Sequence, residues 1–327
     1  MKKIDAIPTW EQIQETHEAI KSMIHRTPVL TNTGINALTG SELYFKCENF
    51  QKVGAFKMRG ASNAALRLTK EEQQKGLATH SSGNHAQAVA LSAKSLGVPA
   101  YIVMPDTSPQ IKKAATAGYG AEITECVNSL EARESTLQEV VDRTGATFIH
   151  PYDNYNVIAG QATCAKELLE EVPDLDIIMS PVGGGGLMSG TALTTRYMSP
   201  AITVYGGEPK IVDDAARSMA AGLLLKNDRI DTIALSVLLS NDHEYCQFDK
   251  GLDPGDYWFG YQIYLMLNAS PDYIFFVYAV LDGQKTYDIE GRGIGLFARS
   301  SAGLAGYAEK GLVHCFAGSD AFLEMQN

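Results

Sequence analysis

Four consecutive glycines, Gly183 to Gly186, constrain the fold of this chain more than any other feature of its sequence. They stand between an apolar run typical of a buried strand, residues 177–182, and a segment with helical periodicity, residues 187–198. Glycine lets the backbone turn sharply and aim several N–H groups at one point, beside the positive end of a helix dipole. The run therefore predicts a phosphate-binding loop, and the alternative interpretation is a tight turn without a ligand.

This glycine run (the tetrad below) matches neither of two common nucleotide-binding loops. No Gly-Lys-Ser/Thr follows it, as in a P-loop. The third glycine of the Gly-x-Gly-x-x-Gly dinucleotide fingerprint is also missing in every register. The predicted anion site therefore belongs to neither of these two classes.

Short β-rich runs alternate with helical periodicity from about residue 9 to residue 235. Helices are predicted at 84–96 and 129–144, because a glycine follows each, and strands at 100–104 and 146–150. Such alternation favours an α/β fold in which parallel-type sheets are covered by helices, with ligands at the carboxyl ends of the strands.

The chain length of 327 residues suggests about two domains. The unit from 67 to 151 looks self-contained. We therefore predict a small domain at 67–151, inserted into a large cofactor domain made of residues 1–66 and 152–327.

Two further motifs are candidates for ligand binding. Residues Ser81-Ser82-Gly83-Asn84-His85 stand at a second predicted helix N-terminus, where N–H groups and hydroxyls suit a carboxylate; the alternative is plain N-capping. Lys57 stands among apolar and small residues, which suits the lowered pKa that an amine needs to attack an aldehyde. Taken alone, however, a lysine is usually a solvated surface charge.

The composition is that of a globular protein without a polyanionic partner. The formal net charge is −11, and no Lys/Arg-rich run offers a surface to nucleic acid. No secretory signal follows the N-terminal lysines, and the most apolar stretch, residues 257–281, is too interrupted to span a bilayer. The five cysteines are scattered and odd in number, which favours free thiols in a reducing compartment: Cys47, Cys126, Cys164, Cys246 and Cys315. We therefore expect a cytoplasmic protein.

In chain order, the motifs Phe56-Lys57-x-Arg59-Gly60, Ser81 to His85 and the tetrad resemble the fold type II (tryptophan synthase β-like) family of pyridoxal-phosphate enzymes. Within that family the likeness is greatest to serine racemase and to serine, threonine or hydroxyaspartate dehydratases, and it runs from residue 25 to residue 234. The resemblance implies a two-domain α/β fold with pyridoxal 5′-phosphate in the cleft. It also implies a dimer or larger homo-oligomer.

The resemblance also implies roles for individual residues. Lys57 would carry the cofactor as a Schiff base and move the Cα proton, and Phe56 would pack near the cofactor ring. Asn84 would hydrogen-bond the phenolic oxygen of the ring, and the tetrad of Gly183, Gly184, Gly185 and Gly186 would hold the phosphate. The substrate carboxylate would lie at Ser81, Ser82, Gly83, Asn84 and His85, with Ser82 as the second acid/base on the far face.

Two more assignments come from the same likeness. Arg133 would assist in binding the substrate. Glu208, Asp214 and the backbone carbonyl of Val212 would bind a divalent cation, and oxygen ligands there would suit Mg²⁺, Ca²⁺ or Mn²⁺. The alternative for this acidic cluster is an ordinary solvated loop.

The likeness stops after Ala234, where the family continues with Asp-Gly and this chain has Leu235-Ser236. Near the end, the family's serine that faces the pyridine nitrogen aligns with Ala317, and Ser319 takes that role only if the register shifts by two. Three explanations stay open: divergence, an altered or misassigned sequence, and a member that has lost activity.

The expected activity is dehydration and deamination of L-serine or L-threonine to a 2-keto acid and ammonia, with 3-hydroxyaspartate as a further substrate. Serine racemase activity would share the same carbanion. Two alternatives are a β-replacement enzyme of the cysteine-synthase kind and a non-catalytic, anion-binding relative.

Overall fold

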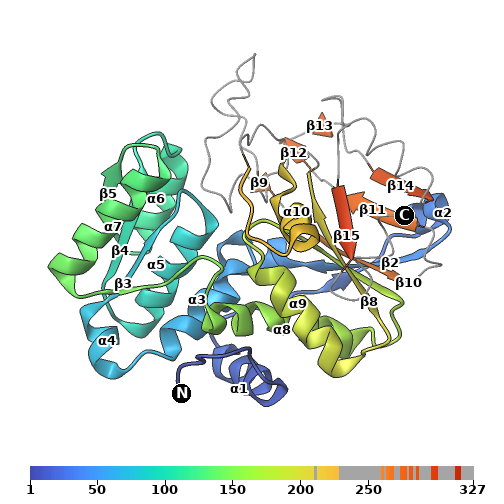
Figure 1. Ribbon diagram of the computed structural model, residues 1–327, viewed down its shortest axis with the longest axis horizontal. Helices are drawn as coiled ribbons and strands as arrows, with labels where there is room; N and C mark the ends of the chain where they lie inside the picture. Colours follow the sequence, from blue (N-terminus) through green and yellow to red (C-terminus); the bar gives the residue numbers. More distant parts are fainter. Residues whose placement is uncertain are drawn as a thin grey trace.

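The computed structural model describes residues 1–209 and 212–227 and, beyond them, the backbone of seven short strands between Phe259 and Ala317 (Figure 1). Those seven strands are β9 (Phe259–Gly260), β10 (Ile263–Asn268), β11 (Tyr273–Val277), β12 (Val280–Asp282), β13 (Lys285–Thr286), β14 (Leu296–Ser300) and β15 (His314–Ala317). No helix of the described residues is both long and apolar enough to cross a membrane.

A four-stranded sheet forms one side of the molecule, and all its strands run parallel. Its order is β5-β4-β3-β6, from β3 (Leu77–His80), β4 (Ala100–Pro105), β5 (Glu122–Cys126) and β6 (Thr147–Phe148). The helices of this unit are α4 (Lys70–Lys75), α5 (Asn84–Leu96), α6 (Gln110–Gly118) and α7 (Leu130–Thr144). Both α5 and α7 end at a glycine in the left-handed region, Gly97 and Gly145, as the sequence predicts.

A six-stranded sheet in the order β1-β2-β10-β7-β8-β15 forms the other side. Its further strands are β1 (Val29–Leu30), β2 (Glu42–Cys47), β7 (Ile177–Pro181) and β8 (Thr203–Glu208). The parallel pair is β7–β8, whereas β1–β2, β10–β2, β10–β7 and β15–β8 are antiparallel. The helical segments of this side are α1 (Trp10–Ile20), α2 (Thr33–Thr39), η1 (Glu48–Phe50), η2 (Lys52–Gly54), α3 (Lys57–Leu66), α8 (Tyr155–Glu171), α9 (Gly186–Met198) and α10 (Asp214–Ala221).

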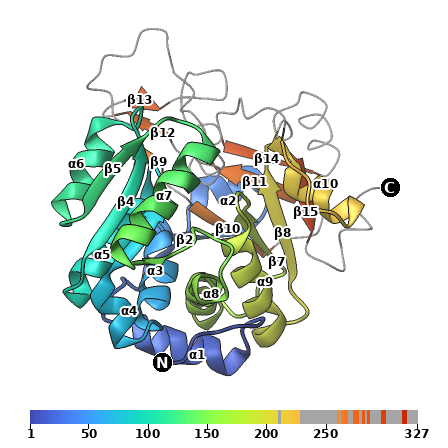
Figure 2. The same cartoon turned by 60° about the vertical axis from the view of Figure 1, so that its left-hand side comes forward.

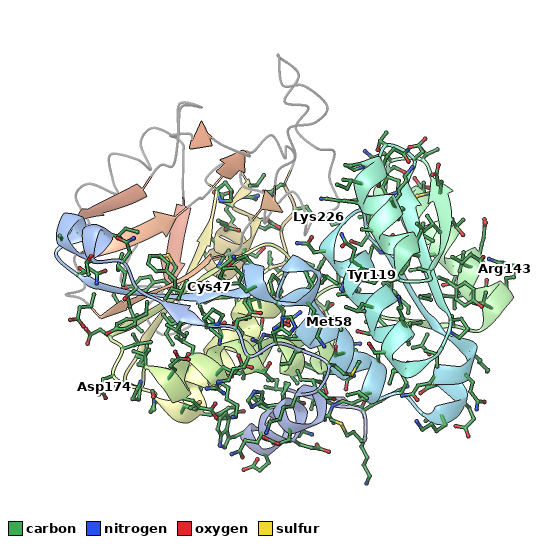
Figure 3. The ribbon with its side chains drawn as sticks, turned by 180° about the vertical axis from the view of Figure 1, so that it is seen from behind. Cys47, Met58, Tyr119, Arg143, Asp174 and Lys226 are labelled. Atoms are coloured by element: carbon green, nitrogen blue, oxygen red, sulfur yellow. The ribbon has the colours of Figure 1, made fainter. Side chains whose placement is uncertain are left out.

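Helix α3 packs against both parts of the molecule. Met58, labelled in Figure 3, is fully buried in a cluster that includes Ile20 of α1 and also Leu77 and Ile102 of the four-stranded sheet. On its other side α3 packs on α8, which in turn packs on α9 (Figure 2). The boundaries at 67 and 151 that we predict for an inserted domain stay a prediction.

Glycines allow these helices to approach closely. A Cβ at Gly160 of α8 would lie 2.5 Å from the carbonyl oxygen of Arg59 and 2.5 Å from the Cα of Gly60, both in α3. A Cβ at Gly190 of α9 would lie 2.6 Å from the backbone nitrogen of Ala162 in α8. Since real Cβ atoms do not approach backbone so closely, α8 sets the spacing between the helix that begins at Lys57 and the helix that follows the tetrad.

Candidate active site

Lys57 is the first residue of α3 and is 7% exposed. Its Nζ donates a hydrogen bond of 2.9 Å to the carbonyl oxygen of Pro151 and lies 5.1 Å from the centre of the Phe56 ring. Burial lowers the pKa of the Lys57 amine to about 8. The structure therefore places at position 57 a desolvated amine that loses its proton more readily than an ordinary lysine.

Phe56 is buried beside this amine and packs in a small cluster with Cys164 of α8 and Leu187 of α9. The residue before the lysine thus contacts the helix that follows the tetrad. The two motifs that the resemblance pairs are consequently neighbours in space.

The tetrad connects β7 to α9, and α9 begins at its last glycine. Gly185 has φ +81°, which L side chains rarely adopt, and no side chain caps the helix there. A Cβ on Gly184 would lie 2.1 Å from Cδ1 of Tyr152, and one on Gly186 would lie 3.0 Å from the Cα of Tyr152. Glycine is therefore required at these positions for conformation and for space.

The segment that follows β6, residues 149–153, brings the lysine and the tetrad together. Pro151 accepts the hydrogen bond from Lys57, and the next residue, Tyr152, lies against Gly184 and Gly186. One dipeptide thus contacts both the amine and the glycine loop. A single small molecule can bridge two features that are this close.

The serine-rich motif meets the same segment. The Nε2 of His85 makes a 2.9 Å hydrogen bond to the carbonyl oxygen of Ile149, and the N–H of Gly83 donates to Oγ of Ser81 at 3.2 Å. Ser81 and Ser82 are buried, and Asn84, half-buried, is the first residue of α5. The predicted carboxylate site and the lysine therefore both contact residues 149–151.

His85 is buried in its neutral form. Burial, and then the nearby charge of Lys57, lower the pKa of the imidazole to about 3. Because Nε2 bonds to a carbonyl and so carries the proton, Nδ1 is an acceptor. Within the described part of the chain this buried atom has no hydrogen-bond partner. A site of this kind fits a ligand with a polar group.

Four rings in a row, which were not among the predicted site residues, line this site: His80, Phe148, His150 and Tyr152. Successive ring centres lie 5.6, 5.5 and 4.7 Å apart. Nδ1 of His150 accepts hydrogen bonds from the N–H groups of Tyr152 (3.3 Å) and Asp153 (2.8 Å), which holds the turn in place. The signal for one of them was present, because His150 is the last residue of the strand predicted at 146–150 and ligands bind at the carboxyl ends of parallel strands.

Arg133 lies in α7 and is 2% exposed. One guanidinium nitrogen donates to Oδ1 of Asn128 at 3.2 Å. Burial, followed by the charge of Arg133, lowers the pKa of His80, the residue just before the serine motif. The structure thus places the charge of Arg133 close to this motif; its contact with a substrate stays a prediction.

The predicted cation ligands cluster where β8 ends and α10 begins. Glu208 is buried and accepts hydrogen bonds from the N–H groups of Ala216 (2.8 Å) and Ala215 (3.4 Å), while Asp214 accepts one from Asn227 (2.7 Å). Burial, helped by the charge of Asp214 and opposed by those N–H groups, raises the pKa of Glu208 to about 8. In the described ranges, no three His, Cys, Asp or Glu side chains form a metal-binding group, so any cation here also needs backbone oxygens such as that of Val212.

Two residues were candidates for the position that faces the pyridine nitrogen, Ser319 and Ala317. Ser319 lies outside the described residues. Ala317, which aligns with that position, is the last residue of β15 and is paired with Tyr205 of β8.

A buried amine of lowered pKa beside a glycine loop at a helix N-terminus defines a site for an aldehyde that carries an anionic group. Comparison with known proteins agrees with this class. Residues 20–247 match the family described as "Pyridoxal-phosphate dependent enzyme", which is more than half of the chain. The chain therefore belongs to the pyridoxal-phosphate-dependent enzyme family, and its fold is fold type II.

Three relatives illustrate the likeness. The chain is 49% identical to a β-hydroxyaspartate dehydratase of Paracoccus denitrificans over 233 residues, which covers 71% of this chain and 74% of the relative. It is 50% identical to a serine racemase of Dictyostelium discoideum over 222 residues, 68% of each chain. The structure of maize serine racemase superposes with a TM-score of 0.69 at 45% identity, covering 71% of this chain and 70% of that one.

Proposed function

We propose that this protein is a pyridoxal-phosphate-dependent ammonia-lyase that converts L-serine, L-threonine or 3-hydroxyaspartate to a 2-keto acid and ammonia, with serine racemase activity at the same site. The relatives named above are a dehydratase and racemases that share about half of the aligned residues with this chain. The observation that carries the proposal is that Pro151 bonds to Lys57 while its neighbour Tyr152 lies against the tetrad.

The described residues fit the cofactor. The glycine loop offers a helix N-terminus for its phosphate, and the Lys57 amine, with its pKa near 8, is ready to bond to its aldehyde. Asn84, at the start of α5, would hydrogen-bond the phenolic oxygen of the ring. When bound, pyridoxal phosphate supplies an electron sink for the bonds at Cα of the amino acid.

The protein's own residues then orient the substrate and move protons. Ser81 to His85 bind the carboxylate at the N-terminus of α5, where the helix dipole favours an anion. The Lys57 amine removes the Cα proton on one face, and the β-hydroxyl leaves as water. Water then hydrolyses the released enamine to the keto acid and ammonia. Ser82, on the opposite face, returns a proton to Cα when the outcome is racemisation.

We also propose that Glu208, Asp214 and the carbonyl of Val212 bind a divalent cation. A cation would neutralise two carboxylates whose pKa values are both raised by burial. Mg²⁺, Ca²⁺ and Mn²⁺ suit these hard oxygen ligands. We further propose that the protein is cytoplasmic and forms a homo-oligomer.

The test is to load the full chain with pyridoxal phosphate, reduce it with borohydride and map the label. The label is expected on Lys57, and a folded, cofactor-bound protein labelled elsewhere refutes the proposed role. Chiral chromatography of reactions with L-serine and L-threonine then identifies keto acid and D-amino acid. Sulfide-dependent product from O-acetylserine without keto acid would indicate a β-replacement enzyme instead.

A further inference from the structure

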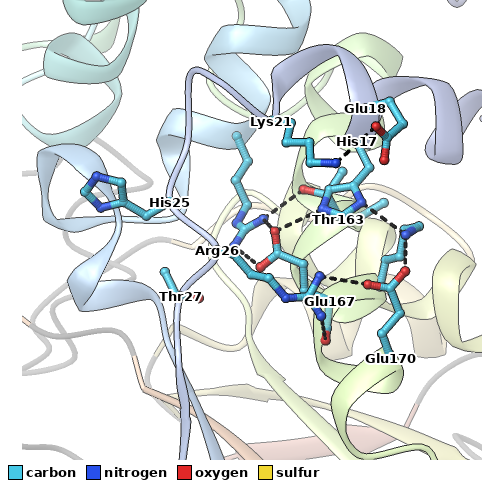
Figure 4. Close-up of polar contacts among 12 residues, drawn as sticks. His17, Glu18, Lys21, His25, Arg26, Thr27, Thr163, Glu167 and Glu170 are labelled. Carbon is cyan, nitrogen blue, oxygen red and sulfur yellow. Dashed lines mark hydrogen bonds and ion pairs between the residues drawn. The ribbon is translucent and has the colours of Figure 1, made fainter.

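Near the Lys57 end of α3 lies a buried group of charges that the reaction does not use, and Figure 4 shows one of its members, Glu167, with Thr163 and His17. At its centre is Arg59, two residues after the lysine and 0% exposed. The acids Glu48, which follows β2, and Glu167, in α8, flank it, and both are also 0% exposed. Burying charges is costly unless each is paired, so such a group needs close geometry.

Every N–H of the Arg59 guanidinium has an acceptor. Nε and one terminal nitrogen form a fork with Glu48, at 2.8 and 2.7 Å. Both terminal nitrogens form a second fork with Glu167, each at 2.8 Å. The remaining N–H donates to Oγ1 of Thr163 at 3.1 Å. Five donors thus meet five acceptors, and two bidentate pairs fix the plane of the group.

The two acids are themselves held from other directions. Glu48 accepts a hydrogen bond from the hydroxyl of Thr27 at 2.6 Å. Glu167 contacts Nζ of Lys46 at 2.8 Å and Nε2 of His17 at 3.1 Å. Although burial alone would raise it, hydrogen bonds from Arg59 and His17 hold the pKa of Glu167 well below its ordinary value. The first turn of α3 is therefore tied to α1, β2 and α8.

No side-chain cap at Phe56 fixes the first turn of α3. The residue before α3, Phe56, makes no side-chain cap, so its first turn lacks the usual means of fixing a helix start. The carbonyl of Arg59 also contacts α8 at Gly160.

We propose that Arg59 is a positioning residue for Lys57: its two carboxylate forks hold the first turn of α3 so that the lysine amine stays buried against the carbonyl of Pro151. The proposal rests on the proposed function for its consequence in catalysis. Its structural part is tested separately, without turnover.

The test compares Arg59→Lys with Arg67→Lys in the full chain. Arg67 is a matched control because it is also buried at the other end of α3, where it donates to Asn63, Lys2, Glu15 and Thr16. A lysine ammonium cannot reproduce the full set of hydrogen bonds that either guanidinium makes, so both variants lose stability. Arg59→Lys alone is expected to let water reach Lys57.

The readout is the pH at which Lys57 is half-labelled by acetic anhydride in cofactor-free protein, followed by peptide mass spectrometry from about pH 6 to 11. Arg59→Lys is expected to raise this midpoint by about one unit or more and to weaken pyridoxal phosphate binding by about tenfold. Arg67→Lys is expected to leave the midpoint at the wild-type value. An unchanged midpoint in folded Arg59→Lys, or an equal rise in Arg67→Lys, overturns the proposal.

If Arg59→Lys does not fold, Thr163→Val decides the question. It removes one of the five acceptors and keeps the carboxylates, so the midpoint is expected to rise in the same direction by a smaller amount. A folded Thr163→Val with the wild-type midpoint counts against positioning. Failure of the proposed function is distinguishable, since the wild type would then carry no borohydride-fixed label on Lys57.

Discussion

Replacing Gly160 with alanine tests whether α8 sets the distance between Lys57 and the tetrad. The added Cβ would lie 2.5 Å from the carbonyl oxygen of Arg59 and from the Cα of Gly60, whereas ordinary contact begins at 3.4 Å. The difference, 3.4 − 2.5 = 0.9 Å, is the distance by which α3 and α8 must move apart, because neither backbone atom can rotate away. Overpacking of this kind costs about 1–3 kcal/mol of unfolding free energy.

The functional effect should exceed the loss of stability. A displacement of about 1 Å at a reacting group costs on the order of 100-fold in rate, and α3 carries Lys57 on its first turn. We therefore expect Gly160→Ala to unfold at lower urea concentration and to form keto acid about 100-fold more slowly when saturated with pyridoxal phosphate.

Gly118→Ala is the matched control. It lies at the end of α6, and a Cβ there meets nothing within 4 Å. It should leave keto-acid formation unchanged and stability equal or slightly higher. If Gly160→Ala matches Gly118→Ala in urea midpoint and in rate, the spacing argument is wrong.

Three further predictions follow from the site. Between pH 8 and 10.5 the unfolded chain binds one more proton at Lys57 than the folded chain, so the stability of cofactor-free protein should rise with pH through this window. Lys57→Met should abolish that rise and increase the free energy of unfolding at pH 7 by up to about 3 kcal/mol, measured by urea unfolding. If the stability of the wild type and of Lys57→Met depends on pH in the same way, this prediction is wrong. Gly184→Ala should weaken pyridoxal phosphate binding, because the added Cβ would lie 2.1 Å from the Tyr152 ring. The double variant Gly184→Ala with Tyr152→Ala should recover part of the affinity in a fluorescence titration, and no recovery would exclude the contact with Tyr152 as the cause. Mg²⁺ should raise the unfolding temperature of the wild type but not of Glu208→Gln, because the variant lacks one ligand; an equal rise in both would remove Glu208 from the cation site.

Much of the fold near the site is predictable because its signals are local. The helix at 84–96 and the glycine that ends it follow from periodicity and from the conformational freedom of Gly97, and the structure has α5 at Asn84–Leu96. The tetrad is similarly visible, since four glycines between an apolar run and a helix require a turn that other residues cannot make. The four-stranded sheet is wholly parallel, which confirms the prediction from the β–α alternation. The six-stranded sheet also contains antiparallel pairs, which no local sequence pattern predicted.

Contacts between residues far apart in the chain could not be predicted from local sequence patterns. Tyr152 lies against the tetrad although about 30 residues separate them in the chain, and the packing of α8 on α9 accompanies this contact. Arg59 meets Glu167 across 108 positions of the chain, and nothing near either residue indicates its partner.

The amino-acid sequence by itself determined the local elements, the glycine loop and the lysine that carries the proposed chemistry, because backbone freedom and side-chain type act over a few residues. Tertiary structure alone decided that the Lys57 amine is desolvated, that Pro151 and Tyr152 join it to the tetrad, and that Arg59 is enclosed by two acids. Desolvation and charge pairing depend on which surfaces meet after packing, and that is a property of the folded chain.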